Sequence, residues 1–325
     1  MRCLFAKPVI ILSRCFGFER CRYDNEVIRS HAVEQLLPFI NPVSVCPETA
    51  IGLGTPRERI RIVSCRERVK LVQPATGRDL TRSIENFCHE FLEGIVDVDG
   101  FILKSRSPTC GIKDAKIYPS AYATTLSGYG SGFFAAKAAR QFPLLPMLSE
   151  RDLALMNRCE HFLIRIFACA ALRMSMKNIR VDTLIKFHTK YKLLIAAYSK
   201  KILNELENIL KRYINTSGGQ YPAIYQRKFQ MAFSRASRRQ AHMKILGESY
   251  KLFANQLSVN ERRIFVGMLE RFESGVVSLG SCVKLMRRFA AEFDREYFLR
   301  QAYFNPYPEA LVPILDRLET RTTCP

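Results

Sequence analysis

Three cysteines in this chain each come shortly after a short apolar run. Val9–Leu12 precedes Cys15, Val43–Val45 precedes Cys46, and Phe101–Leu103 precedes Cys110. Such runs are typical of buried strands, and Pro108 and Gly111 break the third one into a loop. In open α/β sheets, ligands gather at the carboxyl ends of the strands. We therefore predict that the three thiols meet around one centre.

The chemistry of such a centre would be that of a metal or an iron–sulfur cluster. The wide, irregular spacing differs from the paired CxxC of a zinc ribbon, so spacing alone leaves core thiols as an alternative. An iron–sulfur cluster usually takes four cysteines, and three would leave one iron open to a substrate. Cys21, in the same loop as Cys15, is a possible fourth ligand.

Two polar residues lie close to these cysteines in the sequence. Glu48 is two residues after Cys46, and Ser107 is three before Cys110. Beside a metal centre, the carboxylate could act as general base or acid and the hydroxyl could orient a ligand. Without a metal, both residues are equally typical of helix caps and turns.

The order of strand and helix patterns divides the 325 residues into two parts. Residues 1–140 alternate strand-like and helix-like segments, including a helix over 26–38, a hairpin of 60–63 with 69–73, and a helix over 80–94. This alternation predicts an α/β domain, Rossmann-like, with a mostly parallel sheet and flanking helices. Pro143–Pro146 marks the boundary, after which helix patterns alone continue and predict an all-α bundle.

The helical part is expected to contain helices over residues 151–173, 181–213, 221–236, 239–257, 259–274, 281–292 and 295–304. We expect one domain over residues 1–146, a connecting helical segment over 147–178, and an all-α domain over 179–325. Gly128–Gly132 could cradle a phosphate, but it lacks the lysine of a P-loop and is interpreted as a turn.

Cysteine number and charge restrict the class of protein. The sequence has eleven cysteines, no export signal and no apolar run long enough to span a membrane. These features favour a cytoplasmic protein with metal-binding or catalytic thiols over a disulfide framework.

Most of the net charge of +20 lies in the second part, since residues 151–325 hold 30 Lys and Arg against 15 Asp and Glu. The excess Lys and Arg residues could form a binding surface for a polyanion such as nucleic acid, or only a solvated basic surface.

Three motifs in this order give the chain a family resemblance. They are Ser13-x-Cys15 with Arg22-Tyr23-Asp24, Cys46-Pro47-Glu48 with Ile51–Arg57, and Asp99–Gly111. Together they span most of residues 7–140 and resemble the TudS family of thiouracil desulfidases. The sequence departs from that pattern at Cys21, where a small aliphatic residue is usual, at Asn25 in place of glycine, and at Thr109 in place of serine.

The C-terminal part resembles the helical domain of YbgA-type proteins, through Phe187–Leu194, Gln240–His242 and Gln301–Pro308. The combination is similar to the RudS-type two-domain desulfidases, which remove sulfur from 4-thiouridine in transfer RNA. In that arrangement the basic helical domain is thought to hold the RNA, and phosphate neutralisation by Lys and Arg supplies most sequence-independent affinity.

The resemblance also implies roles for individual residues. Cys15, Cys46 and Cys110 would hold three irons of a [4Fe-4S] cluster, and the thiocarbonyl sulfur of the substrate would bind the fourth. Glu48 would move protons, and Ser107 would hydrogen-bond to the base or to the developing intermediate. Lys104, Arg106 and Arg57 are candidates for guiding the phosphate or the ring, or are surface cations.

Other interpretations stay open at this point. Because of the departures around Cys15, the substrate could be a free thiouracil-type base or nucleoside. The protein could also be a non-catalytic nucleic-acid-binding protein with a structural metal site. His188 and His242 invite a catalytic role, but histidines on helices are more typical of hydrogen-bonded core positions.

Overall fold

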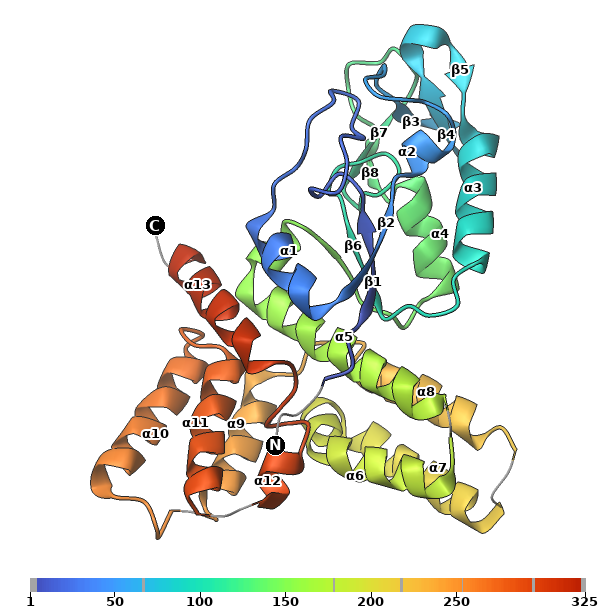
Figure 1. Cartoon of the computed structure of the whole chain (residues 1–325). Helices are drawn as coiled ribbons and strands as arrows, with labels where there is room; N and C mark the ends of the chain where they lie inside the picture. The colour runs from blue at the N-terminus through green and yellow to red at the C-terminus, as the bar shows by residue number, and fades with distance from the viewer. Residues whose placement is uncertain are drawn as a thin grey trace. The chain divides into compact units, whose positions relative to one another are not determined.

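A computed structural model describes residues 5–65, 68–177, 179–216, 219–252, 254–293 and 296–322, the last range without the side chains of 296–297 and 319–322. The chain forms two compact units, one of residues 8–154 and one of residues 155–325 together with residues 1–7. The first is α/β with a parallel sheet and the second is all-helical, as the sequence predicts (Figure 1).

The α/β unit is built on a four-stranded parallel sheet in the order β2-β1-β6-β9. Its strands are β1 Val9–Ser13, β2 Asn41–Val45, β6 Gly100–Leu103 and β9 Met147–Ser149. All pairings are parallel, with Ser13 opposite Val45 and Leu103 opposite Ser149. The carboxyl ends of these strands therefore lie along one edge of the sheet.

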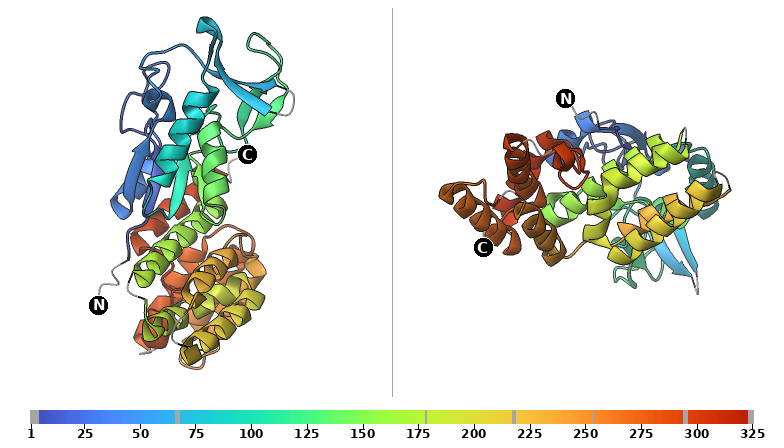
Figure 2. Two further views of the ribbon diagram at one scale, coloured as in Figure 1. Left: turned by 90° about the vertical axis from the view of Figure 1, so that its right-hand side faces the viewer. Right: turned by 90° about the horizontal axis from the view of Figure 1, so that it is seen from below.

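Helices α3 (Thr81–Glu93) and α4 (Phe133–Gln141) lie together on one face of this sheet (Figures 1 and 2). Their buried residues Ile84, Leu92 and Phe134 pack with Phe101 and Leu103 of β6. Residues 101–103 are fully buried, which explains why that strand has an uninterrupted apolar sequence.

A second sheet of five strands, in the order β5-β4-β3-β7-β8, completes this unit. The predicted hairpin is confirmed as β3 (Arg61–Cys65) antiparallel to β4 (Arg68–Gln73). The other strands are β5 Arg78–Asp79, β7 Ala115–Tyr118 and β8 Gly128–Gly130. The turn predicted at Gly128 is wrong, because residues 128–130 pair antiparallel with β7. These short strands lack a periodic apolar pattern.

The helix predicted over residues 26–38 is shorter in the structure. Only α1 (His31–Leu36) and the 3-10 turn η1 (Leu37–Phe39) are helical. The preceding residues are not helical, and the backbone N–H of Ile28 donates to the carbonyl of Cys15 at 2.9 Å. This bond between distant segments replaces a local helical one. Two further helical segments, α2 (Pro47–Ala50) and η2 (Pro74–Thr76), each follow a strand.

The all-helical unit follows the 3-10 turn η3 (Asp152–Ala154) and opens with α5 (Met156–Met176). Its further helices are α6 Val181–Tyr198, α7 Lys200–Thr216, α8 Tyr221–Ala232, α9 Arg239–Tyr250, α10 Val259–Glu273, α11 Leu279–Glu292, α12 Glu296–Arg300, the 3-10 turn η4 Glu309–Leu311 and α13 Val312–Thr322. No described helix is both long and apolar enough to span a membrane.

The single helix predicted over 181–213 is in fact two helices, α6 and α7. Ser199 between them is extended, and its hydroxyl accepts a hydrogen bond from the N–H of Ile202 at 3.2 Å. The serine thereby caps the start of α7, without the glycine or proline that often marks a helix end.

Three other differences concern helix ends and number. The helix predicted over 239–257 ends at Tyr250, the one over 295–304 is reduced to α12, and α13 was not predicted. The gap between the helices predicted over 181–213 and 221–236 includes residues 217–218, which lie outside the described ranges.

The histidines of the helical unit occupy its interior. His188 donates to or accepts from the hydroxyl of Tyr225 at 2.9 Å, and His242 does the same with Tyr303 at 3.3 Å. Both side chains are buried. They are hydrogen-bonded core residues, which is the interpretation that the sequence favoured.

Burial lowers the pKa of His161 and that of His242 to about 4. A histidine with a lowered folded-state pKa stabilises the fold fully above its unfolded pKa of about 6.5, and this stability is lost as the pH falls from there towards 4. We expect His242 alone to account for up to about 2 kcal/mol of lost stability between pH 7.5 and pH 5. Urea unfolding at both pH values gives the pH dependence of the free energy of unfolding. The difference in this dependence between the wild type and His242→Gln is the contribution of His242. The exposed His89→Gln is the control, and equal pH dependence in all three proteins would contradict the prediction.

Candidate active site

The three strand-end cysteines line a single cavity of about 390 Å³. Cys15 lies two residues beyond β1, Cys46 directly follows β2, and Cys110 ends the loop that follows β6. All three thiols are free and buried. Glu48 and Ser107 line the same cavity, and so does Cys21. The structure thus brings together every residue that the sequence analysis placed at the centre.

The loop that carries Cys110 is held by its own polar groups. The hydroxyl of Ser107 accepts hydrogen bonds from the N–H groups of Thr109 at 3.2 Å and Cys110 at 3.1 Å. At the start of the loop, the N–H of Arg106 donates to the carboxylate of Asp114 at 2.9 Å. Ser107 therefore has a structural part in the loop as well as a place in the cavity.

Helix α4 fixes the same loop from the other side. The N–H of Phe134 donates to the carbonyl of Thr109 at 2.9 Å, and that of Gly132 donates to the carbonyl of Gly111 at 2.8 Å. A Cβ on Gly132 would lie 2.5 Å from the backbone of Thr109. Glycine is needed there because helix and loop approach so closely.

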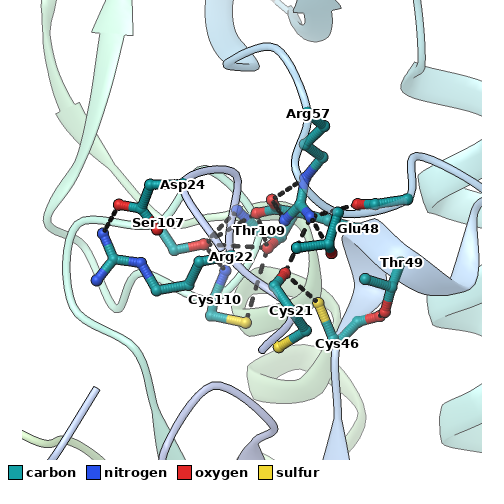
Figure 3. Close-up of polar contacts among 12 residues, drawn as sticks. Cys21, Arg22, Asp24, Cys46, Glu48, Thr49, Arg57, Ser107, Thr109 and Cys110 are labelled. Atoms are coloured by element: carbon teal, nitrogen blue, oxygen red, sulfur yellow. Dashed lines mark hydrogen bonds and ion pairs between the residues drawn. The ribbon is translucent and has the colours of Figure 1, made fainter. Parts of the chain in front are cut away.

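The carboxylate of Glu48 is held at both oxygens (Figure 3). Arg57 pairs with Oε2, its Nη2 making a close ion pair and its Nε a hydrogen bond of 3.2 Å. Oε1 accepts from the hydroxyl of Thr109 at 3.0 Å and from that of Ser107 at 3.4 Å. Those two hydroxyls are 3.0 Å apart. The arrangement is a short chain of proton-carrying groups that ends on a charged carboxylate.

The three candidate cations differ in how the structure uses them. Arg57 is almost fully buried, at 3% side-chain exposure, and also donates to the carbonyls of Cys21 and Gly54 at 2.9 and 2.8 Å. It therefore positions Glu48 and the loops around it. Lys104 binds Glu150 at 2.7 Å. Arg106, at φ 59°, has an exposed side chain and lines the cavity, so it is the best placed of the three to meet a ligand.

Two tyrosines on the cavity wall did not stand out in the sequence as ligand-binding residues. Tyr23 lies under the guanidinium of Arg59, 4.8 Å from the ring centroid, and Tyr118 under that of Arg61 at 4.5 Å. Cations stacked on ring faces keep these rings oriented. Thr109 was noted in the sequence only as a departure from serine, yet its hydroxyl makes the shorter of the two bonds to Glu48.

The environment of Cys21, Cys46 and Cys110 favours the protonated form of these three thiols in the absence of a ligand. Burial raises the pKa of Cys110 to about 12. A hydrogen bond with Cys15 is the main cause that raises the pKa of Cys21 to about 11, and a hydrogen bond with Cys21, followed by burial, raises that of Cys46. Binding of a metal centre here would release protons, because the thiolate is the ligating form.

The donor set fits an iron–sulfur cluster. Buried cysteine thiolates are the usual ligands of such clusters, and the four buried thiols Cys15, Cys21, Cys46 and Cys110 face one cavity. Among the described residues, no group of three His, Cys, Asp or Glu side chains has the spacing of a single-ion site. A [4Fe-4S] cluster binds each thiolate through a different iron, so its ligands need not converge on one point.

Each of the two units matches a model of a known protein family. Residues 10–150 match the family described as 2-thiouracil desulfurase, and residues 192–308 match a family described as protein of unknown function, DUF1722. The chain is 30% identical over 112 residues to the uncharacterized protein YbbK of Bacillus subtilis strain 168. This alignment covers 32% of this chain and 73% of YbbK. The chain therefore belongs to the 2-thiouracil desulfurase family, through its N-terminal α/β unit.

Among solved structures, the α/β part is similar to the [4Fe-4S]-dependent thiouracil desulfidase TudS. The match has 27% sequence identity and a TM-score of 0.37, and it covers 45% of this chain and 93% of that protein.

Proposed function

We propose that this protein is a [4Fe-4S]-dependent desulfidase that removes sulfur from 4-thiouridine in transfer RNA. The observation that carries the proposal is the single cavity, within a 2-thiouracil desulfurase unit, that Cys15, Cys46, Cys110 and Glu48 line together. When bound by the three thiolates, the cluster would supply an iron that acts as a Lewis acid towards the thiocarbonyl sulfur.

The residues around the cavity then have separate parts in the reaction. Glu48 takes a proton from the attacking water, directly or through the hydroxyls of Ser107 and Thr109, which reach its Oε1. Arg57 keeps Oε2 engaged, so Oε1 is the oxygen that exchanges protons. Water adds to the carbon, the carbon–sulfur bond breaks, and sulfide leaves with the transferred protons. The products are uridine within the RNA and hydrogen sulfide, with no net redox change.

A thiouracil ring in folded RNA must leave its stack to reach a buried centre, at a cost of roughly a few kcal/mol. The rings of Tyr23 and Tyr118 on the cavity wall offer faces on which a displaced base could stack, and such stacking contributes about 1–3 kcal/mol per base. Arg106 is an exposed cation on the cavity wall that could meet a phosphate or the ring.

The surface of helix α7 supports RNA as the partner of the helical unit. At 100° per residue, an exposed face spanning about 120° of arc contains only lysine, arginine and asparagine. These residues are Lys200, Lys201, Asn204, Asn208, Lys211, Arg212 and Asn215, here called the α7 basic face. Such a surface pairs cations with hydrogen-bonding amides, which suits a phosphate backbone.

The acidic residues of α7 do not weaken this face. Glu205 binds Lys228 of α8 at 2.6 Å, and Glu207 binds Lys192 of α6 at 2.7 Å. Both carboxylates are thus paired with lysines in partly exposed ion pairs that link α7 to α8 and to α6. The positive charge of the α7 basic face remains available to a polyanion.

Reversing two charges on this face should weaken binding to transfer RNA. We expect Lys211→Glu with Arg212→Glu to reduce the slope of log K against log salt by about 1 for each lost phosphate contact. Filter binding or fluorescence anisotropy over a salt series measures the slope. The control is Arg82→Glu with Arg140→Glu, exposed residues of α3 and α4 with the same change in net charge. An equal loss in both double variants would count against the α7 basic face.

The substrate itself is tested by comparing kcat/KM for three compounds on the reconstituted protein. We expect 4-thiouridine in transfer RNA to be preferred over the free nucleotide and the free base. A preference for free thiouracil or its nucleoside would show that the free compound, and not RNA, is the substrate. Tight RNA binding without turnover of any of the three would instead indicate a non-catalytic nucleic-acid-binding protein with a structural metal site.

A further inference from the structure

Four cysteines, one more than the proposed ligand set, line the cavity. Cys21 is 1% exposed and is the most deeply buried of the four. It lines the cavity beside Cys15 and Cys46, and the Cys46 thiol lies 3.7 Å from its carbonyl oxygen. In Figure 3 the sulfur atoms of Cys21, Cys46 and Cys110 point into the same space. A cluster held by Cys15 and Cys46 would therefore have the Cys21 thiol as its immediate neighbour.

The backbone of Cys21 is fixed by the residues that position the catalytic carboxylate. Its carbonyl accepts a hydrogen bond from Nη1 of Arg57 at 2.9 Å and one from the thiol of Cys46 at 3.7 Å. Its N–H donates to the carbonyl of Glu19 at 3.0 Å. The next residue, Arg22, is held by Asp24 at 2.7 Å. The loop thus directs the Cys21 thiol into the cavity and keeps it there.

We propose that Cys21 is a fourth, displaceable ligand of the cluster, an inference that rests on the proposed function. Four cysteine thiolates are the usual complement of a [4Fe-4S] cluster. Cys21 would release its thiol proton to solvent when its sulfur binds the fourth iron, and it would take a proton from solvent when the substrate's sulfur replaces it. No electron is gained or lost in this exchange.

A displaceable fourth ligand would give the resting protein a complete coordination set. The fourth iron would be shielded from chelators and small anions until a thiolated base enters the cavity. The guanidinium of Arg57 would then position both the proposed base and the proposed fourth ligand, because it binds the carboxylate of Glu48 and the carbonyl of Cys21.

The test compares anaerobically reconstituted wild type with Cys21→Ala and uses the cluster itself as the readout. Both proteins should bind four irons per chain. Upon addition of a chelator with mild oxidant, we expect Cys21→Ala to convert to the three-iron form roughly 10- to 100-fold faster, the range in which loss of a single supporting group lowers metal affinity. Electron paramagnetic resonance follows the three-iron signal, and Mössbauer spectra should show one distinct iron in the variant alone.

Cys65→Ala is the matched control, because it removes an exposed thiol from β3. It should behave as the wild type does. Equal conversion rates and identical Mössbauer spectra in wild type and Cys21→Ala would overturn the assignment of Cys21 and leave the proposed function intact. A wild type that takes up no iron would overturn both.

Discussion

Replacing Glu48 with glutamine should lower kcat for desulfidation roughly 10²- to 10⁴-fold, the usual contribution of a positioned general acid or base. Glutamine keeps the size of the side chain and can still accept from Thr109, but it cannot take a proton from water. The ion pair with Arg57 is lost as well, while the bonds of Arg57 to the carbonyls of Cys21 and Gly54 remain. Single-turnover kinetics on the reconstituted protein measures the effect.

Three measurements separate this chemical effect from a loss of structure. The iron content and the visible absorbance of the cluster should match those of the wild type, and RNA affinity should stay nearly unchanged. Glu85→Gln, an exposed glutamate of α3, makes the same change in charge and should keep full activity. A kcat of Glu48→Gln within about threefold of the wild-type value would show that Glu48 is not the general acid or base, since such a group contributes roughly 10²-fold or more.

Replacing Cys110 with alanine should abolish turnover together with the stable four-iron cluster. The loop that carries Cys110, a proposed ligand, is held by Ser107 and by the N-terminus of α4, and the Cys110 thiol is buried. Alanine leaves the loop in place and removes the sulfur. Iron and acid-labile sulfide per chain, measured after anaerobic reconstitution and desalting, report the loss.

The control for this variant must also remove a buried thiol from the same unit. Cys88→Ala does so, because Cys88 is a residue of α3 that is 1% exposed and packs in the core. It should lose some stability yet keep its cluster and its activity. A Cys110→Ala protein that retained four irons and turned over thiouridine would contradict the assigned ligand set.

The placement of the three cysteines could be predicted from the sequence because it follows from strand ends. Parallel strands with continuous apolar sequence leave little choice of direction, so whatever follows them lies at one edge of the sheet. The position of Glu48 follows in the same way, since it is two residues beyond Cys46. The left-handed conformation of Asn25, at φ 57°, agrees with its place where glycine is usual.

The role of Arg57 could not be predicted, because it depends on contacts between segments distant in the sequence. A cation near an expected polyanion site suggests a ligand contact, whereas burial against Glu48 and two loop carbonyls makes it a positioning residue. The break at Ser199 was missed for a related reason. A serine cap leaves no glycine or proline in the sequence, and the apolar helical pattern continues across it.

The most direct test of the central claim is an anaerobic assay on the reconstituted protein with transfer RNA that contains 4-thiouridine. The loss of thiouridine absorbance and the release of sulfide are followed in the same sample. The proposed function predicts that the two are equal at every time point and that both disappear in Cys110→Ala. Intact thiouridine and no sulfide, in a protein carrying its full complement of iron, would contradict it.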